Sequence, residues 1–360
     1  TKGTRNHPEG EFADRIESLG ANIRSSAGNN TSIISSFCLQ PDLLNIHGLS
    51  GEALCAPTFE EGSIGREKEI QRADLLESLQ DPLKTSFQLL RENLFGYQDY
   101  GLPRLGTEES LNHIDREMLQ EHHQQFITRH NGVLAVFGDI NPEATIEWCE
   151  QAFAGLPRGG KSEATVTELS EPVSSEITHY LDKEQTVIAI GYPGAHITSQ
   201  DVPALEVIHE YCSNMAGPLF TRMREELGLA YYVNATQFLG FGKGLFAFYV
   251  GTAPDKAALA REELLAQIEK LTQEGIPDAA LDHTKTSVLA GDALENQSNH
   301  SMAQVCALNT LFGLGPLHHL AHAEKIQTLS RTDIMKTAQK YFGRKPVVVS
   351  VGPRIHSDRV

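Results

Sequence analysis

Positive charge is scarce in this chain, and long apolar runs do not occur. Asp and Glu number 47 against 30 Lys and Arg, so the formal net charge is −17. Because nucleic-acid binding needs clustered Lys and Arg to meet the phosphates, this balance argues against that class of partner. A membrane-spanning helix needs about 18 or more consecutive apolar residues, and the sequence contains no such run. We therefore expect neither a nucleic-acid nor a membrane partner.

Paired cysteines and the common hydrolase motifs are also missing. Neither His-Glu-x-x-His nor its inverse His-x-x-Glu-His occurs, and no serine or cysteine has the Gly-x-Ser-x-Gly context of a nucleophile. The sequence thus predicts no catalytic residue and no metal ligand in this chain. Without any Cys-x-x-Cys pair, the scattered cysteines are expected to be small buried hydrophobes rather than a disulfide framework: Cys38, Cys55, Cys149, Cys212 and Cys306.

One histidine cluster is a candidate for metal binding. His318, His319 and His322 are spaced so that a helix could present two imidazoles to a metal. No carboxylate lies inside the triplet, and a metal site built on a helix would need a third protein ligand. Exposed helix histidines are therefore the favoured interpretation.

Apolar periodicity predicts an α+β chain. Residues 9–19 place Phe12 and Ile16 on one helical face, whereas residues 31–39 and 245–250 are rich in β-formers. Helical and strand patterns alternate in this way along the whole chain. We expect mixed, mostly antiparallel sheets that are covered by helices.

A stretch without periodic apolar residues divides the chain. It covers residues 157–176 and mixes Gly, Pro, Ser and Thr, which is the composition of a linker. On either side lie two parts of similar size. We expect residues 1–156 and 177–360 to form the two domains.

The two parts repeat one another. In the first, an amphipathic helix leads into Val133–Gly138; in the second, a similar helix leads into Val347–Gly352, about 215 positions later. Both apolar segments are predicted to be short buried strands that end at a glycine. Because the repeats of solenoid proteins are far shorter, this recurrence predicts two homologous domains.

A set of short motifs carries a resemblance to a known family. In chain order the motifs are Lys2-Gly3-Thr4 with the helix at 12–20, Pro57-Thr58-Phe59 with Glu67–Ile70, Asp81-Pro82, Leu102–Thr107, and Pro218–Phe220 through Arg224 to Tyr231. Together they resemble the pitrilysin/insulinase family of zinc metallopeptidases, which includes proteins like the mitochondrial processing peptidase. The likeness extends from residue 1 to about residue 352. It implies a two-domain clamshell that closes over a peptide.

Departures from the family pattern indicate which half of such a peptidase this chain resembles. The inverted zinc motif of the family would fall before Thr1, and Asp74 stands where zinc-bearing members have a Glu as the distal ligand. A helix-mounted Asp is one methylene shorter and would miss the metal by roughly 1 Å. Arg24–Ala27 also replaces the Asn-Ala-x-Thr of zinc-bearing members. The resemblance favours a metal-free half, with no cofactor in this chain and zinc in a partner half.

Arg224 and Tyr231 match the substrate-binding Arg…Tyr motif of the family. The resemblance implies that both donate to a substrate carbonyl and stabilise the oxyanion that forms when zinc-bound hydroxide attacks. Gly228 predicts a helix end between them, so Arg224 would lie in the last turns of a helix and Tyr231 at the start of the next strand. The alternative is a solvated Arg224 paired with Glu225 or Glu226, and a Tyr231 in the core.

We therefore interpret the chain as the metal-free, substrate-binding half of a zinc metalloendopeptidase that cleaves peptides or unfolded polypeptides. Its partner would be a zinc-bearing homologous half, in the same polypeptide or in a separate subunit, and the chain alone would be inactive. Two alternatives stay open: a truncated zinc-bearing subunit whose motif lies before residue 1, and a non-catalytic structural subunit like the core proteins of respiratory complexes. The chain start resembles the middle of a protein and no targeting segment is recognisable, so the compartment is left open.

The purified chain is expected to hold no stoichiometric zinc at neutral pH. The reason is the missing inverted motif together with the short Asp74 side chain at the distal position. Elemental analysis of the dialysed protein measures this directly. One tightly held zinc ion per chain would contradict the metal-free interpretation.

Overall fold

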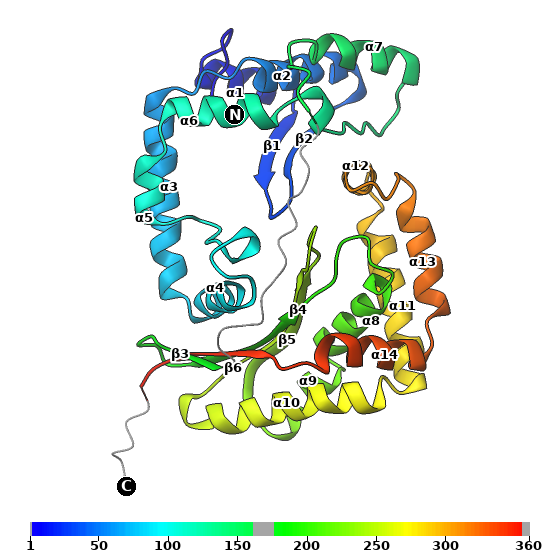
Figure 1. Ribbon diagram of the computed structural model, residues 1–360. Coiled ribbons are helices and arrows are strands. Elements are labelled where there is room, and N and C mark those ends of the chain that lie inside the picture. Colours follow the sequence, from blue (N-terminus) through cyan, green and yellow to red (C-terminus); the bar gives the residue numbers. More distant parts are fainter. Residues whose placement is uncertain (1, 161–175, 355–360) are drawn as a thin grey trace. The chain divides into compact units, whose positions relative to one another are not determined.

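The computed structural model describes residues 2–160 and 176–354 (Figure 1). The predicted linker at 157–176 therefore lies outside the described residues except at its two ends. Of the helices in the described part of the chain, none is long and apolar enough to cross a membrane.

The described residues form two compact units that exchange segments of the chain. The first unit contains the residues up to Asp74 together with 105–160 and 295–317; the second contains 75–104, 176–294 and 318–354. One helical segment from each side of 157–176 thus belongs to the compact unit formed mainly by the other side. The domain bounds 1–156 and 177–360 remain a prediction that rests on the repeated sequence pattern.

The second unit is built on a five-stranded sheet with the strand order β3-β7-β4-β6-β5. The pair β3–β7 is parallel and the other three pairs are antiparallel. This agrees with the predicted mixed, mostly antiparallel sheet. The elements of this unit are α4 (Pro82–Phe95), β3 (Glu176–Tyr180), β4 (Thr186–Pro193), α8 (Val202–Ser213), α9 (Pro218–Phe220), β5 (Ala230–Phe238), β6 (Leu245–Thr252), α10 (Ala257–Glu274), α11 (Asp278–Glu295), α13 (His318–Thr328), α14 (Arg331–Phe342) and β7 (Val347–Gly352).

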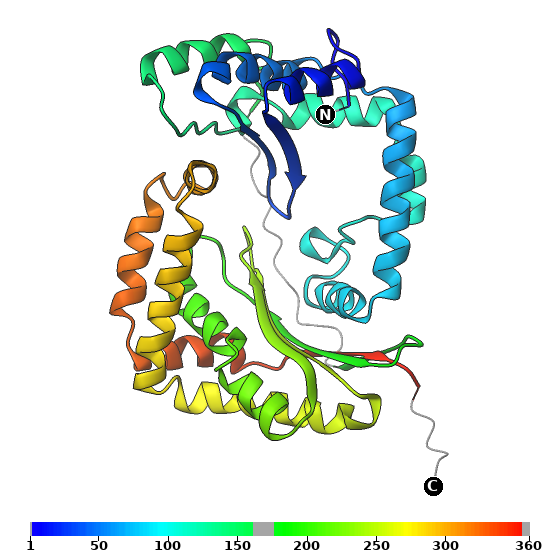
Figure 2. The same cartoon turned by 180° about the vertical axis from the view of Figure 1, so that it is seen from behind.

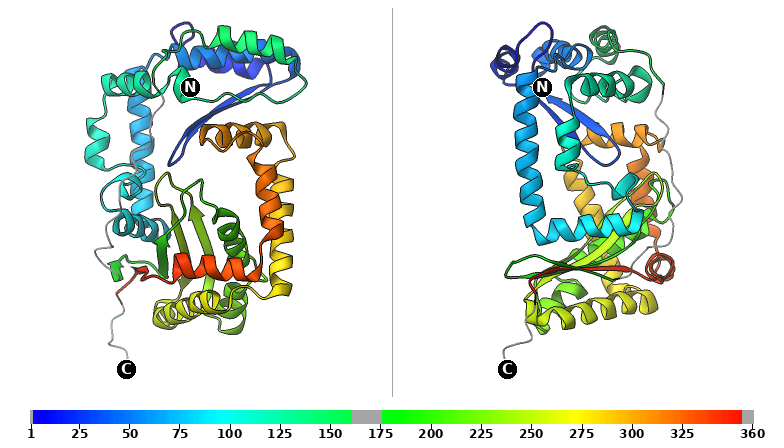
Figure 3. Two further views of the ribbon diagram at one scale, coloured as in Figure 1. Left: turned by 45° about the vertical axis from the view of Figure 1, so that its right-hand side comes forward. Right: turned by 60° about the vertical axis from the view of Figure 1, so that its left-hand side comes forward.

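Helices cover both faces of this sheet. On one face, Phe246 and Phe248 of β6 pack with Phe342 and the other buried residues of α8, α10 and α14. On the opposite face, α4 packs against β4 and β7 through Leu90 and Leu94. Figure 3 shows α4 and α10 on opposite sides of the sheet, and Figure 2 shows the same elements from behind. Because both faces are covered, β4 is apolar and buried along nearly its whole length.

The first unit has a smaller sheet and its own small core. The hairpin strands β1 and β2 pair antiparallel, and Phe12, Ile16, Ile46 and Leu49 form a buried cluster between α1 and α2. The predicted helix at 9–19 and the predicted strand at 31–39 are both present. The elements of this unit are α1 (Glu9–Ser18), β1 (Asn22–Ala27), β2 (Ser32–Phe37), α2 (Leu43–Cys55), α3 (Glu61–Gln80, whose last turns belong to the second unit), α5 (Glu108–His113), α6 (Arg116–Phe126), α7 (Pro142–Ala152) and α12 (Asn299–Leu311).

The strand predicted at Val133–Gly138 is not formed. The helix before it is present as α6, but residues 132–137 adopt no regular secondary structure, and Leu134 is 54% exposed. A strand needs a neighbouring strand to accept and donate its main-chain hydrogen bonds. Within the described residues, the sheet of the first unit consists of β1 and β2, and this segment is paired with neither. Its counterpart β7, in contrast, lies between β3 and β4.

The sequence around α4 fixes both its ends and its distance from the sheet. Asp81 caps the helix by accepting hydrogen bonds from the backbone N–H groups of Leu83 (2.8 Å) and Lys84 (3.1 Å). Gly96, with φ of 72°, ends it. In the middle, Leu90 lies directly over Gly191 of β4, where an added Cβ would come within 2.6–2.7 Å of the leucine side chain. A residue without a Cβ is therefore required beneath the helix.

Leu90→Ala and Gly191→Ala should partly compensate for one another. Alone, Leu90→Ala leaves a cavity and should cost about 2–5 kcal/mol in the free energy of unfolding. Gly191→Ala alone overpacks the same contact and should cost about 1–3 kcal/mol. In the double variant the new methyl group enters the space left by the leucine, so the combined loss should be smaller than the sum by about 1 kcal/mol or more. Urea unfolding of the four proteins measures this coupling, and strictly additive losses would contradict the packing of α4 on β4.

Candidate functional site

Arg224 lies on a short π-helical turn that leads into an edge strand of the second unit. The turn covers Thr221–Glu226, directly after α9, and is anchored by Met223, which is fully buried. The chain then passes through Gly228, with φ of 58°, and enters β5. The sequence predicted a helix end at this glycine, and the structure confirms it. Wide turns of this kind occur mainly at functional positions.

The guanidinium of Arg224 holds the start of β5. Its Nη1 donates to the main-chain carbonyl oxygen of Tyr231 at 2.6 Å, and the group lies 5.2 Å from the centre of the Phe220 ring. A guanidinium carries five N–H donors, and this contact uses one of them. Arg224 is exposed, so its other donors face solvent at the end of the edge strand. The two residues that carry the family motif are therefore brought into direct contact.

A β-bulge at Tyr231 separates its side chain from that of the next residue. In the ladder with β6, Ala230 is opposite Thr252 and Tyr232 is opposite Gly251, so Tyr231 is the extra residue. The Tyr231 side chain is 56% exposed. The alternative in which Tyr231 belongs to the core is therefore wrong. Bulges redirect side chains at sheet edges and beside active sites, and this one turns Tyr231 out to solvent.

Glu226, the acidic residue two positions after Arg224, pairs with a different arginine. Arg222, on the same turn, forms ion pairs with Glu226 (2.8 Å) and with Glu263 of α10 (3.0 Å). In the alternative interpretation, Arg224 would pair with Glu225 or Glu226, but Glu226 pairs with Arg222 instead. This leaves Arg224 directed toward β5.

A polar pocket next to β5 was not anticipated from the sequence. It has a volume of about 370 Å³ and is lined by Asp81 and Leu83 at the start of α4, by Gln185, and by Tyr232, Asn234 and Tyr249 on the α4-facing side of the sheet. Period-2 alternation places Tyr232 and Asn234 on one face of β5, but that Tyr249 of β6 lies beside them follows only from the register between the two strands. The Asp81-Pro82 helix start was the single local signal available.

No metal centre is assembled by the predicted candidates. Among residues 2–160 and 176–354, no three His, Cys, Asp or Glu side chains are placed to hold a metal ion. Asp74 is exposed on α3. The rings of His318 and His322 lie 5.9 Å apart on α13, and His322 Nε2 is hydrogen-bonded to Glu206 of α8. The expectation of exposed helix histidines is wrong for His322, whose side chain is only 14% exposed.

The pair of His322 and Glu206 joins α13 to α8 and is sensitive to protonation. Burial alone would lower the pKa of His322, but the hydrogen bond to Glu206 and the charges of Glu206 and Asp292 hold it above its usual value. The pKa of the neighbouring His318 is lowered by burial and by the charge of His322. Of the two neighbouring imidazoles, His322 is therefore the one that is more readily protonated.

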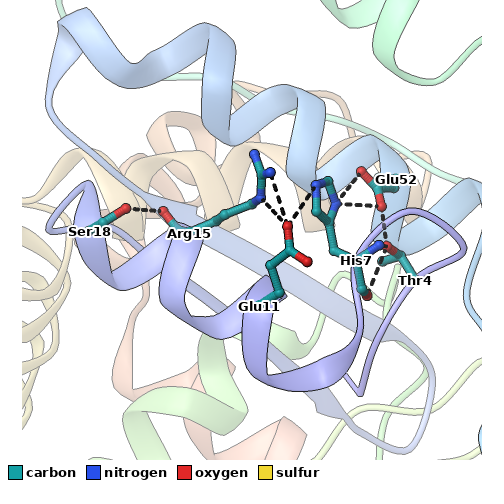
Figure 4. A network of polar contacts seen from close by, with 6 residues as sticks. All are labelled: Thr4, His7, Glu11, Arg15, Ser18 and Glu52. Atoms are coloured by element: carbon teal, nitrogen blue, oxygen red, sulfur yellow. Dashed lines mark hydrogen bonds and ion pairs between the residues drawn. The ribbon is translucent and has the colours of Figure 1, made fainter.

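A second polar network lies in the first unit, at the Lys2–Thr4 segment that carries part of the resemblance (Figure 4). His7 Nδ1 lies 2.9 and 3.1 Å from the two carboxylate oxygens of Glu52, and the Thr4 hydroxyl donates to the same carboxylate. Burial alone would raise the pKa of Glu52, but the hydrogen bonds from Thr4 and His7 hold it below its usual value. Nearby, Arg15 pairs with Glu11 at 3.1 Å. These groups satisfy one another, so the network joins α1 to α2 and is structural.

Comparison with known proteins gives matches over most of the chain. A family profile described as "Peptidase M16 inactive domain" matches residues 113–288, just under half of the chain. An "Uncharacterized zinc protease" of Rickettsia bellii is 21% identical over 359 residues, which cover 98% of this chain and 85% of the relative. A "Non-peptidase homolog YmxG" of Helicobacter pylori is 25% identical over 289 residues, covering 79% of this chain and 66% of the relative.

A solved structure agrees with the fold. The peptidase M16 inactive domain from Pseudomonas fluorescens matches with a TM-score of 0.89 at 21% identity, covering 100% of this chain and 87% of that chain. At this level of identity the likeness concerns the fold alone. The predicted α+β class is confirmed.

His322→Gln should destabilise the protein mainly at acidic to neutral pH. A raised pKa in the folded state means that the pair contributes fully below the unfolded value of about 6.5 and that this contribution is lost as pH rises through the folded pKa. We expect a loss of about 1 kcal/mol near pH 6 that shrinks at alkaline pH. Urea unfolding from pH 5.5 to 9 measures it. His179→Gln, at an exposed position of β3, is the control, and a loss independent of pH would contradict the assigned protonation.

Proposed function

Because the chain belongs to the pitrilysin/insulinase family of zinc peptidases, we propose that it is the metal-free, substrate-binding half of a zinc metalloendopeptidase. The other half would carry the zinc ion and the water-activating glutamate. This chain would supply Arg224 and Tyr231 to a peptide held between the halves. Alone, it would not cleave peptides.

The observation that carries the proposal is the arrangement of Arg224 and Tyr231. Both side chains are exposed at the start of an edge strand, and the guanidinium holds the main chain of the tyrosine. Exposed N–H and O–H donors can polarise a carbonyl and stabilise the oxyanion that develops on it. An exposed tyrosine on a bulge contributes little to the core. Its placement is therefore easier to account for by an external partner than by packing.

The metal-free assignment has separate support. The profile that matches residues 113–288 is that of an inactive peptidase domain. The chain contains no zinc-peptidase motif in either orientation, and the resemblance would place Asp74 where zinc-bearing members have the distal ligand. Zinc chemistry in the assembly would then depend on the partner half. A water molecule bound to the zinc ion of that half would be the nucleophile.

We also propose that the two parts of the chain are copies of one ancestral domain. Each part contains a helix, two antiparallel strands, a helix, a long helix and then a helix that belongs to the other compact unit, in the same order. The first series is α1, β1, β2, α2, α3 and α4, and the second is α8, β5, β6, α10, α11 and α12. A reciprocal exchange of α4 and α12 is what a duplicated fold with internal two-fold symmetry would produce.

A structural subunit is the second candidate function. The relative in Helicobacter pylori carries the name "Non-peptidase homolog", so a protein similar to this chain over four-fifths of its length has been named for the lack of that activity. In such a role Arg224 and Tyr231 would serve packing or assembly. The two candidates differ in whether these side chains affect turnover.

Tyr231→Phe should lower turnover of the assembled enzyme by roughly 10²–10³-fold, since that is the typical effect of losing one oxyanion donor. The change removes only a hydroxyl from an exposed ring, so KM and stability should hardly change. Peptide hydrolysis with the zinc-bearing half present measures kcat and KM. The matched control is Tyr180→Phe, because Tyr180 is also 56% exposed and lies on β3. Unchanged turnover in the Tyr231 variant would favour the structural subunit.

Arg224→Lys should also be poorly tolerated. Lysine keeps the charge but loses the planar set of donors that can bind the Tyr231 carbonyl and a substrate at once. We expect kcat/KM to fall by about tenfold or more in the same assay. Arg222→Lys is the control, since Arg222 lies on the same turn but pairs with Glu226 and Glu263. Equal effects of the two substitutions would argue against a substrate role for Arg224.

A further inference from the structure

The pocket beside β5 has a lining suited to a cation. Its polar groups are the carboxylate of Asp81, the hydroxyls of Tyr232 and Tyr249, and the side-chain amides of Gln185 and Asn234. The only formal charge among the lining residues is thus negative. Lys84, the next cation along α4, is directed to Glu77, with which it forms an ion pair at 2.9 Å.

Two local features of the chain shape this pocket. The bulge at Tyr231 turns Tyr232 and Asn234 toward the face covered by α4, while Val233 points into the opposite core. Gly251 lies beneath the Tyr232 ring, where an added Cβ would come within 2.3–2.8 Å of the ring and its hydroxyl. The ring can therefore lie against the strand only because this position has no side chain.

Asp81 is held in place at the start of α4. Its Oδ1 accepts the two backbone N–H groups that begin α4, and the helix N-terminus favours a negative charge there. Burial and the charge of Asp81 raise the pKa of Tyr232 to about 12. At neutral pH its hydroxyl is therefore protonated and can accept a hydrogen bond from a bound cation.

We propose that this pocket binds the ammonium or guanidinium group of a Lys or Arg side chain in a peptide. The carboxylate supplies a charge-assisted hydrogen bond, and the faces of Tyr232 and Tyr249 supply cation–π contacts. The pocket volume of about 370 Å³ is within the range of small-ligand sites. The net charge of −17 attracts basic segments over a longer distance.

The cation site itself is independent of the proposed function, but the choice of a peptide as its carrier rests on that function. The test therefore uses this chain alone, without a zinc-bearing partner. Calorimetry measures the Kd of two blocked pentapeptides, Ala-Ala-X-Ala-Ala, in which X is lysine or its uncharged isostere norleucine. Nα-acetyl-lysine methylamide is the second probe and carries no peptide on either side. Failure to hydrolyse peptides in an assembled enzyme would leave these measurements unaffected.

We expect the lysine peptide to bind at least tenfold more tightly than the norleucine peptide. Asp81→Asn should abolish this preference, since asparagine retains a capping oxygen for α4 but no charge. The matched control is Asp115→Asn, because Asp115 caps α6 through the backbone N–H of Met118 and is not a lining residue of the pocket. Tyr249→Phe should weaken lysine binding several-fold without altering the Tm.

Several results would overturn the proposal. They are equal binding of the two peptides, a preference that persists in Asp81→Asn, a loss of the same size in Asp115→Asn, or no binding of either peptide up to millimolar concentration. If the free lysine derivative competes as strongly as the peptide, the cation site stands and the peptide carrier is wrong. Unaltered thermal unfolding of each variant ensures that a loss of binding is not a loss of fold.

Discussion

The contact of α4 with β4 and β7 determines most of the second unit. Without this helix, one face of the five-stranded sheet would expose Val347, Val349 and Ala247 to water. With the helix in place, β4 can be apolar on both faces, and Gly191 is needed because Leu90 lies against it. The first residues of the same helix also form one side of the cation pocket. Packing and binding thus share one element.

The bulge in β5 places the side chains of two adjacent tyrosines in different environments. Tyr231 is turned to solvent beside Arg224, and Tyr232 is turned onto the sheet against Gly251. Side chains alternate between the two faces of a regular strand. Without the bulge, the alternation that places Val233 and Ala235 in the core would place Tyr231 there as well, instead of Ala230. The extra residue keeps Val233 and Ala235 in the core. It also places an exposed hydroxyl at the edge.

Local patterns in the sequence were sufficient to predict several elements. The helix at 9–19, the strand at 245–250 and the break at Gly228 follow from spacing, β-propensity and φ preference, which act within a few residues. The strand at Val133–Gly138 was wrong because strand formation depends on a partner that periodicity does not supply. The exchange of α4 and the lining of the pocket likewise depend on contacts between distant parts of the chain. Arg224 and Tyr231 were found by resemblance, whereas their mutual hydrogen bond required the structure.

The exchange of α4 has a consequence for how the chain reaches its native state. This helix belongs to the first third of the given sequence, but it packs on β7, which is synthesised much later. Contacts between such distant residues form slowly, because loop-closure entropy is lost before they are gained. Until β7 is available, Leu90, Leu94 and Phe95 have no complete surface to cover them. The second unit therefore cannot complete its fold until β7 has been synthesised, and until then the nascent chain exposes apolar surface of the kind that makes folding intermediates prone to aggregation.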